Sequence, residues 1–368
     1  SIKSEEGGDA LAVLAGGKVS NEEAYLLQKL AREILGTENI DLGAERMWLK
    51  AVRRVLDICG PGTEGPTPRA ISEAEAIVIA GSGLDESHPV AAMAVSQAAR
   101  YGKAAVVEIA GREEPLIAWD SSMIRIADNR LGTVLKAAAE IFENKSGSEA
   151  AAAVQVEEEN LEKICRLLSM PDSVMIVTPE YFVAAEEDDI EALVDAGEKA
   201  GMLARGRNRM LLLSRFSNAA GTAAAGGAPG CGPGLQKLDK NGLDREGIHK
   251  AVKNGRIRGL LVFGTAGEQG ALKAPFTAAV CGHYSEAPPG ADYLFPARQA
   301  VTREGCFLNA SWQLRCNEDV EGFPDERLSE WRLICDLAGA MGAKWEYSSL
   351  EKVREEMKKK AFVEQAEF

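Results

Sequence analysis

The sequence has no long apolar run, no excess of basic charge and no leader-like start. Its apolar runs fall short of the roughly 18 to 20 residues that a membrane-spanning helix needs, and the first residues, SIKSEEGGD, are acidic where a secretion signal would be basic. A formal net charge of -14 argues against a nucleic-acid binder, which needs clustered Lys and Arg. We therefore expect a chain that does not span a membrane and that lies in the cytoplasm, or on the cytoplasmic face of a membrane complex.

Cysteine and histidine, the residues most used in metal sites, are few and scattered. Seven cysteines occur without any C-x-x-C pair, at positions 59, 165, 231, 281, 306, 316 and 335. The three histidines, His88, His249 and His283, have no metal-binding spacing. We expect most cysteines to be reduced and buried, with Cys231, in a Gly/Pro-rich loop, as the exception. There is no G-x-S-x-G elbow and no cysteine beside a base, so we predict no catalytic residue and no metal site.

A buried strand and a capped helix open the chain. The apolar run ALAVLAG, 10–16, predicts a strand buried on both faces. Ser20 and Glu23 form an S-x-x-E capping box for the next helix, and Gly36 ends that helix where a left-handed residue is favoured. The turn-rich segment GPGTEGPTP, 60–68, then predicts a domain crossing.

Strands and helices alternate as far as residue 214. Strands are predicted at 77–80, 104–109, 124–127, 173–177 and 209–214. Helices are expected between them, with a polar connector near 144–158. Helices of this length between strands predict an open, mostly parallel sheet covered on both faces, which is an α/β fold. The acid-rich stretch 185–192 is interpreted as the first turn of a helix, with an acidic docking site as the alternative.

The rest of the chain continues this alternation after one interruption. The stretch SNAAGTAAAGGAPGCGPG, 217–234, is too rich in Gly and Ala to predict a core element. A helix–strand pair at 247–264 and a strand at 291–297 follow. Two helices close the chain, at about 326–342 and 348–360. The last is amphipathic and highly charged, which favours a surface helix over a membrane binder.

The segment GSGLDESHP, 81–89, is the clearest candidate for a binding loop. It lies between a strand and a helix, where backbone N–H groups can bind an anion, and Glu108 suits a ribose ligand. The third glycine of G-x-G-x-x-G would be residue 86, which is a glutamate and would repel a pyrophosphate. A tight turn is therefore favoured over an NAD site. His88, beside Pro89, is expected to be a hydrogen-bonded structural residue.

Five segments, taken in order, resemble the molybdopterin oxidoreductase family, which includes formate dehydrogenases, nitrate reductases and the large G subunit of NADH:quinone oxidoreductase. They are GGKVSNEEAYLLQKLAREILGTENID, IVIAGSGLDESHPV, IRIADNRLGTVLKAAAEIF, SNAAG and ADYLFPARQAVTREGCFLNASWQLR. The resemblance covers nearly the whole chain. It implies two αβα domains with mostly parallel sheets, in which 73–207 is inserted into a domain made of 8–72 and 208–345. A charged helix and tail, 346–368, would follow.

The resemblance also implies a cofactor site. Active members hold two pterin guanine dinucleotides with Mo or W. The matching positions are Gly81, Ser82, Gly83, His88, Gly132, Thr133, Asn218 and Gly221. We expect this site to be degenerate and empty.

Three departures from the family pattern support that expectation. A formate dehydrogenase-like segment supplies the metal ligand at a Cys that is followed by a His, and these two positions fall on Met47 and Trp48. A thioether does not ionise, and an indole offers only an N–H donor. Val134 stands where the family has an Asp that is expected to hold a guanine.

Two hypotheses follow from the resemblance. In the first, the chain is a cofactor-free domain, similar to the G subunit of NADH dehydrogenase, that supports iron–sulfur modules and other subunits of an NADH-linked redox complex. The clusters would lie on N-terminal modules or partner subunits. In the second, the chain binds molybdopterin guanine dinucleotide with Mo or W and is a formate dehydrogenase-like oxidoreductase subunit. An NAD-binding protein or an unrelated α/β fold is the remaining alternative.

Overall fold

The computed structural model describes residues 2–111, 121–264, 272–283, 287–298, 302, 304–318 and 329–360. The chain forms two compact units. Unit 1 comprises Ser1–Arg46, Phe216–Asn309 and Gln313–Phe368, and unit 2 comprises Met47–Arg215 and Ala310–Trp312. The units change at Arg46 and Arg215, whereas the sequence analysis placed its boundaries near 72 and 208. The turn-rich segment 60–68 lies inside unit 2.

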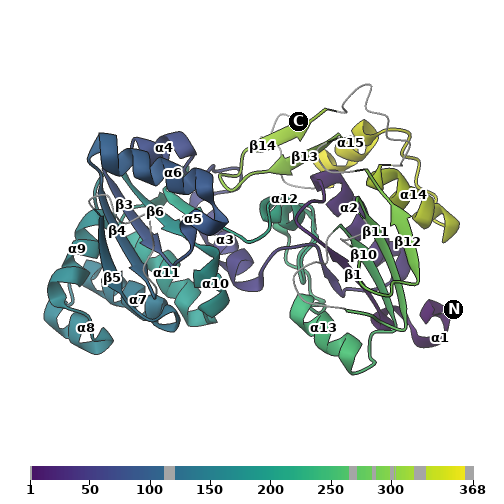
Figure 1. Ribbon diagram of the computed structural model, residues 1–368, viewed down its shortest axis with the longest axis horizontal. Helices are drawn as coiled ribbons and strands as arrows, with labels where there is room; N and C mark the ends of the chain where they lie inside the picture. The colour runs from purple at the N-terminus through teal and green to yellow at the C-terminus, as the bar shows by residue number, and fades with distance from the viewer. Residues whose placement is uncertain are drawn as a thin grey trace. The chain divides into compact units, whose positions relative to one another are not determined.

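Unit 1 is built on five parallel strands in the order β12-β11-β10-β1-β2 (Figure 1). The strands are β1 (Leu11–Ala15), β2 (Ile40–Asp41), β10 (Gly259–Phe263), β11 (Phe276–Cys281) and β12 (Tyr293–Pro296). Strand β1 is buried on both faces because Val13 and Ala15 enter one hydrophobic core while Ala12 and Leu14 enter another. At the edge of the sheet, β12 leaves Tyr293 58% exposed.

Helices cover both faces of this sheet. They are α1 (Ile2–Glu6), α2 (Asn21–Lys29), α12 (Ala219–Ala224), α13 (Arg245–Lys253), α14 (Glu330–Ala340) and α15 (Leu350–Lys360), with the π-helix η2 (Leu30–Leu35) and the short 3₁₀ helices η1 (Gly8–Ala10) and η6 (Pro233–Leu235). Helices α2, α14 and α15 share the core of Val13, and α13 shares the core of Leu14. The predicted capping box is confirmed, since Glu23 N donates to Ser20 Oγ and Ser20 N donates to Glu23 Oε2.

Unit 2 repeats this arrangement with strands in the order β5-β4-β3-β6-β9, all parallel (Figure 1). They are β3 (Ala76–Ala80), β4 (Ala105–Ala110), β5 (Ser121–Arg125), β6 (Ser173–Val177) and β9 (Met210–Leu212). The helices are α3 (Arg46–Cys59), α4 (Pro68–Ser72), α5 (Leu84–Ser87), α6 (Pro89–Gln97), α7 (Leu131–Phe142), α8 (Gly147–Val154), α9 (Glu158–Leu168), α10 (Pro179–Ala184) and α11 (Glu187–Lys199), with η3 (Ala98–Gly102) and η5 (Asp128–Arg130). Helices α4 and α6 pack with Ile77 and Ile79 of β3. Helix α9 contacts β3 and β6, and α7 packs on α9 and α11. Both units are therefore αβα layers, which confirms the predicted fold class.

Two antiparallel pairs complete the fold. They are β7 (Leu203–Ala204) with β8 (Arg207–Asn208), and β13 (Gly305–Leu308) with β14 (Leu314–Asn317). The sequence analysis predicted neither pair. Within the described ranges, no helix is both long and apolar enough to cross a membrane.

Two local predictions were wrong. The expected connector near 144–158 contains helix α8. The Gly/Ala-rich stretch contains α12, whose residues are all buried. Small side chains allow α12 to approach α2 closely, because a Cβ at Gly221 would overlap Asn21 Oδ1.

The cysteine prediction was correct for most positions and wrong for Cys231. That thiol is fully buried, and Cys59, Cys165 and Cys281 are also buried and outside any disulfide. The pair that departs from the expectation is Cys306 and Cys316, which form a disulfide across the β13–β14 hairpin.

Candidate functional site

The loop 81–88 follows β3 at the carboxyl edge of the unit 2 sheet. On one side β3 pairs with β4, the next strand along the chain, and on its other side it pairs with β6. The strand order therefore reverses between β3 and β6, and open α/β sheets bind ligands at such a switch point. Gly81 N donates to Ile109 O at 2.9 Å, and Thr178 N donates to Ala80 O at 3.0 Å. These bonds fix the start of the loop to the neighbouring strands.

The backbone of this loop requires glycine, yet the space that glycine opens is filled by the protein. Gly81 has φ +99° and Gly83 has φ +78°, a region that favours glycine. A Cβ at Gly81 would overlap Thr178 Oγ1. Ser82 is buried, and Glu86 is exposed at the position of the missing third glycine. The loop is a tight turn packed against the start of α10.

Two buried oxygens beside this loop have no hydrogen-bond partner in the described structure, Thr178 Oγ1 and Glu180 Oε2. Such atoms can mark a ligand site. Thr178 is fully buried against Gly81, so its hydroxyl does not face an open site. The Glu180 carboxylate would repel a pyrophosphate. The orphaned atoms therefore do not form an anion cradle.

His88 is hydrogen-bonded, as predicted from its place beside Pro89. Its Nδ1 lies 3.0 Å from Ser87 Oγ, and its backbone N–H donates to Leu84 O at 2.9 Å. Burial lowers the pKa of its imidazole. A groove of about 420 Å³ beside α6 includes Asp85, Met93, Arg100 and Tyr101 in its lining but none of Gly81, Ser82 or Gly83.

Gly132 and Thr133 lie in the first turn of α7, in unit 2. A Cβ at Gly132 would overlap the Asp189 carboxylate, which also accepts a hydrogen bond from Glu186 N at 2.8 Å. Thr133 Oγ1 donates to Arg130 O at 2.7 Å. Next to them, Val134 is fully buried and apolar. The Asp189 carboxylate already accepts a helix-capping hydrogen bond, and the side chain of Val134 has no acceptor atom. Neither side chain therefore offers a guanine a ready hydrogen-bond acceptor.

Asn218 and Gly221 lie in unit 1, where their polar contacts are internal. The fully buried Asn218 donates from Nδ2 to Val19 O at 2.8 Å and to Asn21 Oδ1 at 3.0 Å. Its Oδ1 accepts from Leu308 N at 3.0 Å. These three bonds leave little capacity for a ligand, so Asn218 joins α12 to α2 and β13. This role was not predicted from the sequence.

Met47 and Trp48 stand at the positions aligned with the family's metal ligand and its neighbouring histidine. Trp48 is only 2% exposed, and its Nε1 donates to Leu212 O at 3.0 Å. The indole therefore anchors α3 to the end of β9. Met47 is half-buried and offers a neutral thioether.

The chain's own thiols are poor substitutes for the missing ligand. Burial raises the pKa of Cys165 and of Cys335 to about 11, and it also raises the pKa of Cys59. Within the described ranges, no group of three or more His, Cys, Asp or Glu is arranged to hold a metal ion. The residues at the predicted site do not fit a metal–pterin group.

The glutamate weighed as a ribose ligand, Glu108, is buried within β4, opposite Ile79 of β3 and Met123 of β5. The eight predicted cofactor residues are divided between the two units, with six in unit 2 and Asn218 and Gly221 in unit 1. Whether they ever bind a cofactor stays a prediction.

The similarity to known proteins extends over most of the chain. Probable oxidoreductase YjgC of Bacillus subtilis (strain 168) is 23% identical over 426 aligned residues, which cover 97% of this chain and 42% of that protein. A putative formate dehydrogenase of Staphylococcus haemolyticus (strain JCSC1435) is 23% identical over 412 residues, with the same two coverages of 97% and 42%. The chain thus spans less than half the length of these relatives.

A solved structure shares the fold. It belongs to the formyltransferase/hydrolase complex (FhcABCD) of Methylorubrum extorquens, crystallised with methylofuran, and matches with a TM-score of 0.60 at 16% identity over 90% of this chain and 91% of the other. The model of the molybdopterin oxidoreductase family matches residues 1–340. The chain therefore belongs to the molybdopterin oxidoreductase family.

Proposed function

We propose that this chain is a cofactor-free molybdopterin-oxidoreductase domain of an electron-transfer complex, similar in role to the G subunit of NADH dehydrogenase. It would act as a scaffold for iron–sulfur modules and neighbouring subunits of an NADH-linked complex. The observation that carries the proposal is the burial of Trp48, whose N–H is bonded to Leu212 O. A residue in that state serves the fold of unit 2 and is not available to a metal centre.

Two further observations support the absence of a pterin. The Asp189 carboxylate lies against Gly132, where a guanine would need an acceptor that is still free. The Asn218 carboxamide is engaged by three bonds inside unit 1. Leaving a buried guanine edge unpaired at such places would cost about 1–3 kcal/mol for each missing bond.

The scaffold role is supported by two different observations. The matched structure is a subunit of a multi-subunit complex. Edge strand β12 exposes apolar side chains, with Tyr293, Leu294 and Phe295 all in the exposed class. Contiguous exposed apolar residues are typical of surfaces that bind other proteins.

The test is elemental analysis for Mo, W and Fe, together with fluorescence of acid-oxidised pterin. The chain would be purified from a host that makes the cofactor, with a formate dehydrogenase of the same family purified in parallel as the positive control. We expect metal and pterin in the control and neither Mo, W nor pterin in this chain. Stoichiometric Mo or W with pterin would refute the proposal and support the second candidate, a formate dehydrogenase-like pterin-binding subunit, which the retained loop 81–88 favours.

A further inference from the structure

The β13–β14 hairpin carries two cysteines that face each other across its ladder. The strand register pairs Cys306 with Cys316, and their sulfurs form a disulfide. Because the two residues are directly opposed, the bond can open and close without a change of register. The other five cysteines of the chain are not in a disulfide.

The two sulfurs differ in how easily a reagent can reach them. Cys306 is 1% exposed, whereas Cys316 belongs to a run of exposed residues in β14. An external thiolate therefore approaches the bond from the Cys316 side. Attack at that sulfur makes Cys306 the leaving group.

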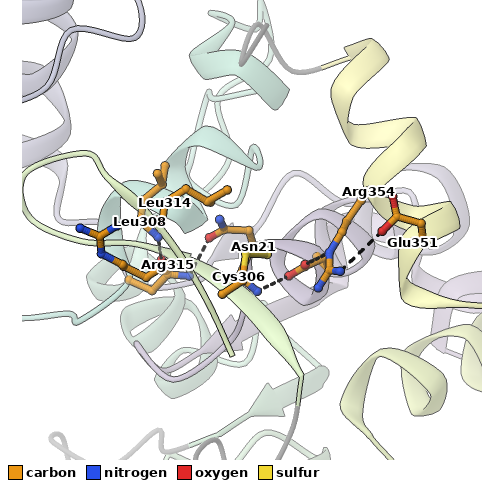
Figure 2. Close-up of a disulfide and its surroundings, with 10 residues drawn as sticks. Asn21, Cys306, Leu308, Leu314, Arg315, Glu351 and Arg354 are labelled. Carbon is orange, nitrogen blue, oxygen red and sulfur yellow. Dashed lines mark hydrogen bonds and ion pairs between the residues drawn. A yellow bond between two sulfur atoms is a disulfide. The ribbon is translucent and has the colours of Figure 1, made fainter. Parts of the chain in front are cut away.

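Strand β13 is fixed to the core of unit 1 by side chains of two helices (Figure 2). Cys306 N donates to Glu22 Oε2 at 3.0 Å, and Glu22 Oε1 accepts from Arg354 Nε at 2.7 Å. Leu308 N donates to the Asn218 carboxamide at 3.0 Å. These bonds hold β13 in place whatever the state of the disulfide.

Strand β14 is attached to β13 by the antiparallel ladder and by the disulfide. The side chain of Arg315 donates to Leu314 O and to Gln313 Oε1, which belong to its own hairpin. The three residues that follow Leu314 are exposed. The turn before β14 is fixed by Ser311, which accepts from Gly65 N at 3.0 Å and donates to Pro66 O at 2.7 Å. The ladder and the disulfide hold β14 itself on β13, and the disulfide is the covalent part of that attachment.

We propose that the Cys306–Cys316 disulfide is a reversible redox clip, which holds β14 on β13 when oxidised and releases β14 when a dithiol reductant opens it. One thiolate of the reductant bonds to Cys316 Sγ as the Cys306–Cys316 bond breaks. The second thiolate of the reductant then displaces Cys316, so the reductant leaves as a disulfide and the chain keeps two thiols. Two electrons and two protons pass to the chain, and a small disulfide such as oxidised glutathione reverses the reaction.

Hydrogen exchange measured by mass spectrometry on the intact chain tests the clip. The disulfide joins residues with a sequence separation of 10. A disulfide that closes a loop of that size shifts the equilibrium between the closed and the open hairpin by about 100-fold towards the closed form. Peptides that cover 305–317 should therefore exchange up to about 100-fold faster after treatment with dithiothreitol than after oxidised glutathione, while peptides of α9, in the other unit, should not change.

Two variants complete the test. Cys316→Ser should exchange fast at 305–317 with or without dithiothreitol. Cys335→Ser, which removes a half-buried free thiol, should respond to dithiothreitol as the unmodified chain does. Survival of the disulfide in native protein treated with dithiothreitol would overturn the proposal, as would equal exchange in the two states. Failure of oxidised glutathione to restore the same pair, shown by peptide mapping, would also overturn it.

Discussion

Replacing Arg354 by alanine should destabilise unit 1 far more than an ordinary surface substitution. Its guanidinium lies 2.7 Å from Glu22, whose side chain is 1% exposed while that of Arg354 is 18% exposed. Removing the cation leaves a buried carboxylate whose other oxygen accepts from Cys306 N. Breaking a buried ion pair from one side costs about 3–5 kcal/mol, and the partial exposure of Arg354 places the expected loss near about 3 kcal/mol.

The assay is urea unfolding followed by circular dichroism, with two comparison variants. Lys352→Ala removes one positive charge from the same helix, but its partner Glu355 is exposed, so we expect a loss below about 0.5 kcal/mol. Arg354→Ala combined with Glu22→Gln should recover more than about 1 kcal/mol, because a neutral amide is less costly to bury than an unpaired carboxylate. If Arg354→Ala matches Lys352→Ala, or if Glu22→Gln gives no recovery, the burial argument fails.

Three further changes test other parts of the fold. Burial alone would raise the pKa of Glu356, but hydrogen bonds from Tyr347, Lys29 and Tyr25 lower it from 4.5 to about 2. The stability that the ionised Glu356 adds is therefore present above pH 4.5 and is lost as the pH falls towards 2. In acid titrations of unfolding, a Glu356→Gln chain should lose less stability over that range than the unmodified chain. Gly221→Ala should lower the free energy of unfolding by about 1–3 kcal/mol, because the added Cβ would overlap neighbouring atoms. Gly339→Ala, in a helix with open space around it, should raise the free energy of unfolding by up to about 0.5 kcal/mol. Similar effects of the two substitutions in urea titrations would mean that close packing at Gly221 is not what requires a glycine there. Trp48→Phe should cost about 1–2 kcal/mol by leaving a buried carbonyl unpaired, and an unchanged urea midpoint would mean that the indole N–H has no structural role.

The alternation of strands and helices was predictable because it depends on local patterns. The apolar run at 173–177 coincides with β6, and the Ser20–Glu23 box marks the start of α2. A central parallel strand such as β1, β3 or β6 is buried on both faces, so it appears in the sequence as a short apolar run. Patterns of this kind need no knowledge of distant partners.

The features that were missed depend on distant partners or on close packing. Cys306 and Cys316 pair only because the strand register places them opposite each other. Helix α12 has the composition of a loop, and only its fit against Asn21 explains why small residues form a core element there. Strand β11 was missed although it lies between β10 and β12.

The position of the candidate loop between a strand and a helix was predictable, because it depends on neighbouring residues. The loop 81–88 does lie at the carboxyl edge of a parallel sheet, at its switch point. The internal use of Asn218 could not be predicted, because its partners Val19 and Leu308 lie far from it in the sequence. No local pattern indicates which donors a folded chain has already used.

The path of the chain through its two units has a consequence for synthesis on the ribosome. Unit 2 is nearly continuous, so most of it can fold as soon as Arg215 has emerged. Strand β1 must wait for β10, since Leu11 pairs with Gly259, which is made roughly 250 residues later. At about 5–20 residues per second this delay lasts about 12–50 s, during which the edge of this apolar strand that faces β10 remains unpaired. The nascent chain is therefore the form that we expect to need a chaperone most, with β1 as the segment to be protected.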